Sequence, residues 1–439
     1  MRITATDVAH ITSGRLVGAE SVADGVSFDS RSVRLGDLFV AISAERDGND
    51  YVAAARDAGA AFALVSRGRA LDGFSCVEVE DTTHALAQLG REFRARLTES
   101  VNGRVIGITG SAGKTSTKNL VTAVLSQTFA RVHAAVHSLN NDIGVPVTIL
   151  NAPADADALV LEMGMRGFHE IERLCSIASP TIGVITNIGD AHGERVGGAE
   201  GIARAKGELV ASLPTNGVAV LNADDVWCSY LSALAPCTVL TFGESDVADM
   251  RWEVESVNDV GVVTARVFYA GETATITPAL PGVHMVANSA AAVLVGVACG
   301  ISLVDSVRGI GKENVEHGRM VWRNRGSAQR ILDDSYNANE SSMIAAVRVL
   351  SSASGEHKIA VLGRMAEVTD VEGAHTTVAR LINEAGIRLL ALETHLYGTR
   401  SYSLDEVMGV LGAEVWDTLL VKGSRAAATE RVVENLLRN

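Results

Sequence analysis

One glycine-rich segment restricts the possible folds of this chain more than any other: TGSAGKT at residues 109–115. It ends a mostly apolar run, residues 104–109, that is typical of a buried parallel strand. After it, apolar residues recur with helical spacing at Leu120, Val121 and Val124. A glycine-rich turn between a strand and a helix offers free backbone N–H groups and a helix N-terminus to phosphate oxygens. The sequence therefore predicts a nucleotide-phosphate loop in a parallel α/β sheet.

Two side chains of this loop carry the predicted phosphate and metal chemistry. Lys114 would bridge the outer phosphates, and the Thr115 hydroxyl would face Mg²⁺. The spacing departs from the common GxxxxGKT pattern, because Ile108 stands at its first glycine position. The alternative is a glycine-rich turn with a surface lysine, and the flanking strand and helix favour the nucleotide loop. The other predicted ATP-binding residues of the loop are Gly110, Ser111, Ala112, Gly113 and Ser116.

Further polar residues follow the next apolar strands. Glu162 ends the strand at residues 158–162, and a carboxylate there would point into the crevice where ligands bind and could hold Mg²⁺. His192 follows the strand at residues 181–187, at the same sheet edge, although loop histidines are more often surface residues. Lys206 lies in a helical stretch and by itself would be a solvated lysine. A solvated carboxylate at the strand end remains the alternative for Glu162.

A turn-rich polar segment, LNNDIGVP, lies at residues 139–146. The side chains of Asn140 and Asn141 could orient a substrate or cap a helix, and the residues alone leave both roles open.

The chain divides into three regions of different texture. Residues 1–100 alternate short apolar runs with an alanine-rich helical stretch at 51–58, which is typical of a small α/β domain. The region 101–312 holds the parallel strands, an alternating stretch at 252–276 that predicts antiparallel edge hairpins, and a helix at 285–299. The third region, 313–439, alternates strands with helices like a Rossmann domain. The strands expected in the first and third regions are residues 38–42, 61–65, 330–334, 358–362, 389–392 and 417–421.

Bulk composition excludes several classes of protein. A chain of 439 residues suits two to three domains. The net charge of −14 argues against a nucleic-acid binder, because phosphate backbones require an excess of Lys and Arg. The five cysteines show no CxxC spacing, which disfavours a zinc site. The most apolar stretch, residues 290–299, is too short to span a bilayer, and no secretory signal is visible. We expect a soluble cytoplasmic protein without membrane insertion.

The order of the motifs resembles the Mur ligases of peptidoglycan synthesis, over nearly the whole chain. Two of the strings, DDSYNAN and VKGSR, are typical of the branch that adds D-alanyl-D-alanine to UDP-N-acetylmuramoyl-tripeptide. The matching strings are FDSR at 28–31, GDLF at 36–39, TGSAGKT at 109–115, LNNDIGVP at 139–146, LEMG at 161–164, TNIGDAH at 186–192, AKGE at 205–208, LPGVHMVAN at 280–288, HGRM at 317–320, DDSYNAN at 333–339 and VKGSR at 421–425.

The resemblance implies a three-domain ligase with a defined chemistry. Residues 1–100 would bind the UDP-sugar, residues 101–312 ATP, and residues 313–439 would form the Rossmann-like third domain. ATP would phosphorylate the free carboxylate of the UDP-sugar peptide, an amine would attack the acyl phosphate, and ADP and phosphate would leave. The substrates would be small molecules, a UDP-sugar peptide and a D-dipeptide or other amine, and we expect a monomer.

The resemblance also assigns residues. Two Mg²⁺ sites would use Thr115, Glu162, His192 and a carbamylated Lys206, because a carbamate turns the ammonium into an anionic oxygen ligand. Lys114, His192 and Lys206 would thus be the catalytic set. The remaining implied contacts are Asn288, Arg319 and Asp334 for ATP, and Ser30, Arg31, Asn140, Asn141, Asn337, Lys422 and Arg425 for the substrates.

Three positions depart from the family pattern. Asn49 stands where a histidine is usual, in a loop at residues 43–51 that is one residue short, Arg364 replaces an aspartate, and Met285 replaces an asparagine. None belongs to the ATP or metal set. Two other functions remain open: a Mur-like ligase for a different carboxylate and amine in secondary metabolism or cofactor assembly, and a silent nucleotide-binding subunit. The intact set of Lys114, Glu162, His192 and Lys206 argues against the silent subunit.

Overall fold

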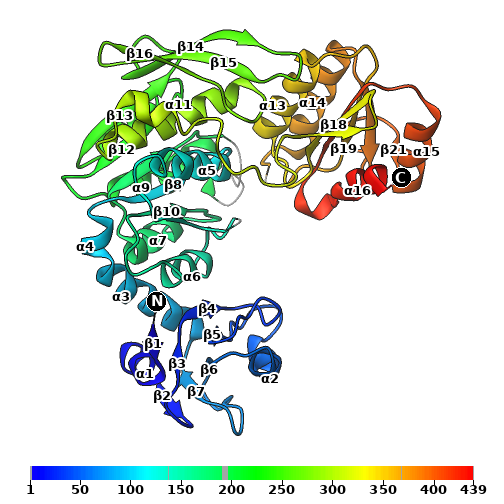
Figure 1. The fold of residues 1–439 in the computed structure, drawn as a ribbon. Helices are drawn as coiled ribbons and strands as arrows, with labels where there is room; N and C mark the ends of the chain where they lie inside the picture. Colours follow the sequence, from blue (N-terminus) through cyan, green and yellow to red (C-terminus); the bar gives the residue numbers. More distant parts are fainter. Residues whose placement is uncertain (1, 137, 190–195, 367, 439) are drawn as a thin grey trace.

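The computed structural model describes residues 2–136, 138–189, 196–366 and 368–438. In the described residues three large β-sheets with their helices follow one another along the chain, and each takes its strands from one stretch of sequence. Figure 1 shows the first sheet at one end of the molecule, the central sheet in the middle and the third beside the central one. None of the described helices combines the length and apolar character needed to cross a bilayer.

The first sheet is mixed and has the order β2-β7-β6-β5-β4 in the described residues, with β1 and β3 paired beside it. Its two longest helices, α1 and α3, begin at side-chain caps: Asp81 accepts hydrogen bonds from the N–H groups of Thr83 and His84 at the start of α3. The elements are β1 (Ile3–Thr4), α1 (Ala5–Thr12), β2 (Arg15–Val17), β3 (Val22–Ala23), β4 (Gly25–Ser27), β5 (Asp37–Val40), η1 (Gly48–Tyr51), α2 (Val52–Asp57), β6 (Phe62–Ser66), β7 (Cys76–Val79), α3 (Thr82–Arg96) and α4 (Thr98–Val101).

The central sheet has the order β16-β15-β14-β13-β12-β11-β8-β10-β9, parallel from β9 to β14 and antiparallel at the β14–β16 edge. The strand order reverses at β8, because β10 pairs with it on one side and β11 on the other. Ligands bind at such a switch point. The elements are β8 (Val105–Thr109), α5 (Lys114–Leu125), β9 (Val132–Ala134), α6 (Gly144–Leu150), β10 (Ala158–Glu162), α7 (Glu170–Ala178), β11 (Ile182–Ile185), α9 (Gly198–Ala211), β12 (Val218–Asn222), α10 (Cys228–Leu234), β13 (Thr238–Gly243), β14 (Met250–Val257), β15 (Val263–Tyr269), β16 (Glu272–Ile276), α11 (Val283–Ala298) and α12 (Leu303–Val307).

The third sheet has the order β17-β18-β22-β19-β20-β21, in which only β17 is antiparallel among the described strands. The expectation of four strands here was incomplete: β17 and β21 join the sheet at its two edges. The elements are β17 (Val321–Arg325), β18 (Gln329–Asp334), α13 (Glu340–Ser352), β19 (Lys358–Leu362), α14 (Val371–Glu384), β20 (Arg388–Leu392), β21 (Ser401–Tyr402), α15 (Leu404–Ala413), β22 (Thr418–Lys422), η2 (Arg425–Ala427) and α16 (Glu430–Arg438).

The hydrophobic cores do not correspond one to one with the three large sheets. A single apolar core joins the first sheet to α3, α6, α7 and α9, and its members run from Ile3 to Leu209. On the other face of the central sheet, α5 and α11 pack against each other over a second core. The third sheet has separate cores on its two faces, built from Met320 onward. The predicted α/β class, with a mostly parallel central sheet and an antiparallel edge, is confirmed.

Candidate active site

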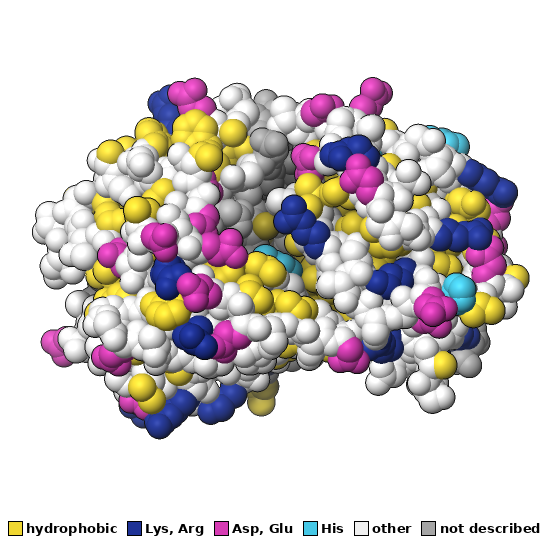
Figure 2. Space-filling view, turned by 90° about the horizontal axis from the view of Figure 1, so that it is seen from above, with side chains coloured by type: hydrophobic (Ala, Val, Ile, Leu, Met, Phe, Trp, Pro, Cys, Tyr) yellow, Lys and Arg dark blue, Asp and Glu magenta, His cyan; other side chains and the backbone are white. Residues whose placement is uncertain are grey.

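A cavity of about 810 Å³ opens at the carboxyl edge of the central sheet, beside the third domain. Figure 2 shows the surface hollowed between these two parts of the molecule. Most of the predicted ATP, metal and substrate residues converge on it from distant segments. The predicted residues in its lining are Ser111, Ala112, Gly113, Lys114, Thr115, Ser116, Asn140, Asn141, Glu162, Lys206, Asn288, Arg319, Asp334, Asn337, Lys422 and Arg425.

The phosphate loop is fixed by two glycines and by the segment after β11. Gly110 has φ +153° and Gly113 φ +83°, where side chains are strained, and a Cβ on Gly110 would overlap the Thr186 hydroxyl. The amide of Asn187 lies under the loop: its Oδ1 accepts the Ala112 N–H at 3.0 Å. The loop conformation is therefore held by neighbouring strands, with the N-terminus of α5 directed into the cavity.

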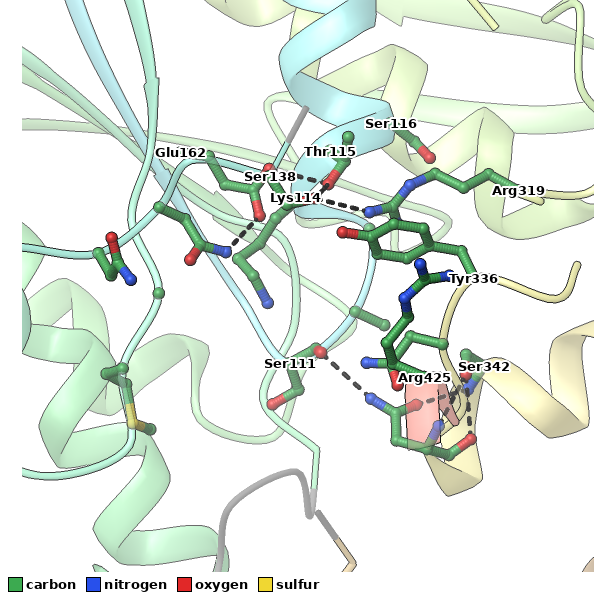
Figure 3. Close-up of a pocket in the computed structure, with 18 of the residues that line it drawn as sticks. Ser111, Lys114, Thr115, Ser116, Ser138, Glu162, Arg319, Tyr336, Ser342 and Arg425 are labelled. Carbon is green, nitrogen blue, oxygen red and sulfur yellow. Dashed lines mark hydrogen bonds between the residues drawn. The ribbon is translucent and has the colours of Figure 1, made fainter. Parts of the chain in front are cut away.

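Lys114 is the first residue of α5 and extends along the loop (Figure 3). Its Nζ donates to the Gly110 carbonyl at 2.7 Å. The ammonium thus lies within the turn where phosphate oxygens would meet free N–H groups. Ser116, two residues further on α5, also lines the cavity.

Thr115, Glu162 and Asn140 form one hydrogen-bonded group. The Thr115 hydroxyl donates to Glu162 Oε2 at 2.8 Å, and Asn140 Nδ2 donates to Glu162 Oε1 at 2.8 Å. Glu162 is only 1% exposed, at the end of β10, and no cation of the described residues forms an ion pair with it. A buried carboxylate beside a hydroxyl is a set of hard oxygen donors, which fits Mg²⁺.

Lys206 lines the same cavity from α9 and is only 2% exposed. This position removes the simplest alternative, a solvated surface lysine. His192 lies outside the described residues, and within the described ranges no group of three or more His, Cys, Asp and Glu side chains gathers as a metal site. A second cation site therefore rests on Lys206 and on a residue that the structure does not describe.

Arg319 reaches the site from the segment that leads into the third domain. Its Nη2 donates to Ser138 Oγ at 2.8 Å, and its guanidinium lies 4.0 Å from the centre of the Tyr336 ring. Ser138 in turn lies 3.4 Å from the Thr115 hydroxyl (Figure 3). Arg425 approaches the same ring, 5.9 Å from its centre. Tyr336 thus holds two guanidinium groups at the cavity by cation–π contact.

Asp334 and Lys422 form a buried ion pair at the ends of β18 and β22, with 2.5 Å between Oδ2 and Nζ. Lys422 also donates to the Asn337 carbonyl at 2.8 Å, and Asp334 accepts the Met320 N–H at 3.0 Å. Burial raises the pKa of the Asp334 carboxyl, and the Lys422 ammonium opposes that rise. The ion pair therefore holds Asp334, an expected ATP ligand, next to Lys422, an expected substrate ligand.

Comparison with known proteins decides the family. Residues 108–296 match the Mur ligase middle domain. The chain is 34% identical to the UDP-N-acetylmuramoyl-tripeptide–D-alanyl-D-alanine ligase of Escherichia coli, over 100% of this chain and 99% of the relative. It is 35% identical to the protein of that name in Bacillus subtilis, over 84% and 80%. The chain belongs to the Mur ligase family.

Solved structures agree with this assignment. A MurF crystal structure from Acinetobacter baumannii superposes with a TM-score of 0.88 at 28% identity, over 100% of this chain and 99% of that one. A MurF ligase from Thermotoga maritima in complex with ADP gives 0.81 at 27% identity, over 94% and 97%. The resemblance of the sequence to the Mur ligases is thus confirmed.

The first domain of this Mur ligase contributes less to the cavity than expected. Ser30 and Arg31 lie on the loop after β4 and are not among the residues that line it. The Arg31 guanidinium pairs with Asp29 at 2.6 Å. The first-domain residues in the lining are Ile42, Ser43, Ala44 and Thr83.

One of the three family departures has a structural explanation. Asn49 is buried, and its amide binds Asp47 Oδ1 at 2.7 Å and the Ser66 N–H at 3.0 Å, so it holds its loop to β6. Nothing in the structure explains the exposed Arg364 or Met285, which is buried in the first turn of α11.

The two asparagines of the polar loop lie in different surroundings. Asn140 donates to Glu162 in the site, whereas Asn141 Oδ1 accepts the N–H of Gly144 at 2.9 Å at the start of α6, as a helix cap would. Sequence reasoning missed three site residues, Ser138, Tyr336 and Asn339. Asn339 Nδ2 donates to the Ser111 carbonyl at 3.2 Å, which joins the third domain to the phosphate loop. Tyr336 and Asn339 belong to the DDSYNAN string at residues 333–339, and that string was the sequence signal that could have identified them.

Proposed function

We propose that this chain is an ATP-dependent ligase that joins D-alanyl-D-alanine to UDP-N-acetylmuramoyl-tripeptide, a step of peptidoglycan precursor synthesis. The observation that carries the proposal is one cavity that collects the phosphate loop, the Thr115–Glu162 pair and the cations Lys422 and Arg425. The names of its relatives support the substrate pair. In this proposal residues 1–100 bind the UDP-sugar, 101–312 ATP, and 313–439 close the site.

The reaction requires activation of a carboxylate. The terminal phosphoryl group of ATP passes to the free carboxylate of the tripeptide, the amine of the dipeptide attacks the acyl phosphate, and phosphate leaves as the amide forms. Mg²⁺, when bound, supplies positive charge to the transferred phosphoryl oxygens. Lys114 adds a cation at the phosphate loop, and Thr115 with Glu162 holds the metal.

Other residues bind the nucleotide, the second metal ion and the two substrates. Asn288, Arg319 and Asp334 take the nucleotide, and Ser116 completes the phosphate contacts. Carbamylated Lys206 and His192 hold a second Mg²⁺. The substrate residues are Ser30 and Arg31 for the uridine nucleotide, Asn140, Asn141 and Asn337 for the sugar-peptide, and Lys422 and Arg425 for the incoming dipeptide. In this proposal the enzyme works as a monomer in the cytoplasm, where nucleotide substrates are made.

A substrate-pair screen tests the proposal. The purified chain is incubated with ATP, Mg²⁺ and every pairing of candidate carboxylates with candidate amines, and phosphate release is measured. We expect release only when UDP-N-acetylmuramoyl-tripeptide and D-alanyl-D-alanine are both present. Release with a non-muramoyl acid and none with the tripeptide would replace this proposal by a Mur-like ligase of another pathway.

A further inference from the structure

A buried lysine on the phosphate-loop helix is not used by the proposed reaction. Lys118 lies on α5, one turn beyond Lys114, and is only 2% exposed. A buried ammonium is costly unless it is paired and hydrogen-bonded. Lys118 Nζ donates to the Ala135 carbonyl at 2.8 Å and lies 3.3 Å from Glu316 Oε1. The lysine therefore ties α5 to two segments that carry site residues.

These contacts belong to a closed ring of interactions that includes Arg319. The segment of Ala135 continues to Ser138, which accepts the hydrogen bond from Arg319. The other oxygen of Glu316, Oε2, lies 3.6 Å from Arg319 Nε. One carboxylate is thus shared between Lys118 and Arg319. Side by side with this pair, Asn119 Nδ2 donates to the Asn314 carbonyl at 2.9 Å, so α5 holds the linker at two points.

We propose that Lys118 and Glu316 are positioning residues of the ligase reaction, which hold the Arg319 guanidinium at the phosphate loop. The inference rests on the proposed function for the role of Arg319 toward ATP. The segment 313–320 has no helix or strand of its own in the structure. The Gly318 carbonyl accepts the Tyr336 N–H at 2.9 Å and anchors the backbone beside Arg319, whereas side-chain contacts set the position of the guanidinium itself. The shared carboxylate makes that position depend on the helix that begins at the phosphate loop.

The test is a set of matched variants, Glu316→Gln and Lys118→Met, with Lys118→Arg as the conservative change. We expect Glu316→Gln and Lys118→Met to raise KM for ATP and Kd for a non-hydrolysable ATP analogue by roughly tenfold or more, because small displacements of a charged ligand cost large factors. KM for the carboxylate substrate should not change, and Lys118→Arg should recover most of the loss. Lys312→Met is the control: Lys312 lies on the same linker, and its Nζ donates to Gln127 Oε1 at 3.0 Å.

A double-variant cycle separates positioning from general stability. If Glu316 acts through Arg319, Glu316→Gln should change analogue affinity less than about twofold in an Arg319→Ala background. A full loss in that background, or unchanged KM for ATP with only a lower Tm in Glu316→Gln, would overturn the proposal. If Lys118→Met fails to fold, Glu316→Gln still tests whether the shared carboxylate positions Arg319. Analogue binding needs no ligase substrate, so a failure of the proposed substrate pair would leave this test readable.

Discussion

At the residue scale, the site depends on a few buried polar side chains. Glu162 and Lys206 are each almost fully enclosed, at 1% and 2% exposure, and both line the cavity. Burying charged groups lowers stability unless partners compensate. Substitutions at such positions should therefore change activity more than they change stability.

Glu162→Gln should lower kcat/KM by roughly a hundredfold or more, because the amide removes the anionic charge that a divalent cation requires. The glutamine oxygen can accept from Thr115, but its NH2 then faces the Asn140 Nδ2 donor, so one of the two hydrogen bonds is lost and Tm should fall modestly. The measurement is phosphate release over a Mg²⁺ titration, with the exposed Glu172→Gln as control. An unchanged Mg²⁺ requirement would remove Glu162 from the metal set.

Lys206→Ala should reduce kcat strongly, since it removes the carbamate oxygens expected at the second Mg²⁺. Short carboxylic acids added to the assay should restore part of the rate by supplying an oxygen ligand in the vacated space. Full activity of the variant, with no effect of added acid, would contradict the carbamate.

At the element scale, the phosphate loop and the helix after it are positioned by backbone constraints. Gly110→Ala places a methyl group against Thr186 at φ +153°, and we expect it to abolish analogue binding while the separate cores of the third domain persist. Gly409→Ala in α15 is the matched control, because nothing lies near the added methyl group. It should stabilise the protein by about 0.5–1 kcal/mol. Binding is measured by calorimetry and stability by chemical denaturation.

A second element-scale prediction concerns the loop after β19. His375 on α14 is fully buried: its Nε2 accepts the Met365 N–H at 3.0 Å and its Nδ1 donates to the Val371 carbonyl at 2.6 Å. Burial lowers the pKa of His375 below its usual 6.5. Below pH 6.5 the unfolded chain therefore binds a proton that the folded chain excludes, and stability falls as pH drops from there toward the folded pKa.

The expected loss approaches about 1.4 kcal/mol per pH unit in that window and levels off below the folded pKa. Denaturant unfolding between about pH 8 and pH 5 measures it. His375→Gln should be less stable at the upper pH and show a flatter dependence, whereas His84→Gln, at an exposed position, should keep the wild-type slope. An equally steep slope in His375→Gln would assign the effect to other groups.

The sequence predicted elements better than it predicted contacts between them. Apolar runs such as residues 105–109, and the alternation of apolar and polar residues that leads into β16, identify strands. The side-chain pattern of a strand follows from whether one or both of its faces are buried. Short edge strands such as β17, with its mixed polar sequence, carry no such signal. Contacts such as Lys118 with Glu316 join residues far apart in the chain, and no local pattern encodes them.

At the scale of the whole molecule, ATP binding should be coupled to domain closure, because its predicted ligands come from both the central and third domains. Asn339 joins these domains by its bond to the Ser111 carbonyl and also caps α13 by accepting the Ser342 N–H at 3.0 Å. Asn339→Ser keeps a capping hydroxyl but cannot reach the loop.

We expect Asn339→Ser to adopt a more open average shape without nucleotide and to bind the ATP analogue roughly fivefold more weakly, since one interdomain bond is lost. Small-angle scattering gives the radius of gyration with and without analogue, and wild type is the reference. If neither protein compacts with analogue plus dipeptide, the site is already closed and the coupling is absent.

The apolar core that runs from Ile3 to Leu209 has a consequence for biosynthesis. A chain leaves the ribosome from its N-terminus, and domains usually fold in that order as they emerge. A smaller core, from Phe39 to Cys76, lies within the first hundred residues, but the apolar face of α3 is covered only when α6 and α7 have been translated. A nascent chain halted before α6 would therefore expose apolar surface of α3, and translation pauses between α3 and α7 would favour aggregation.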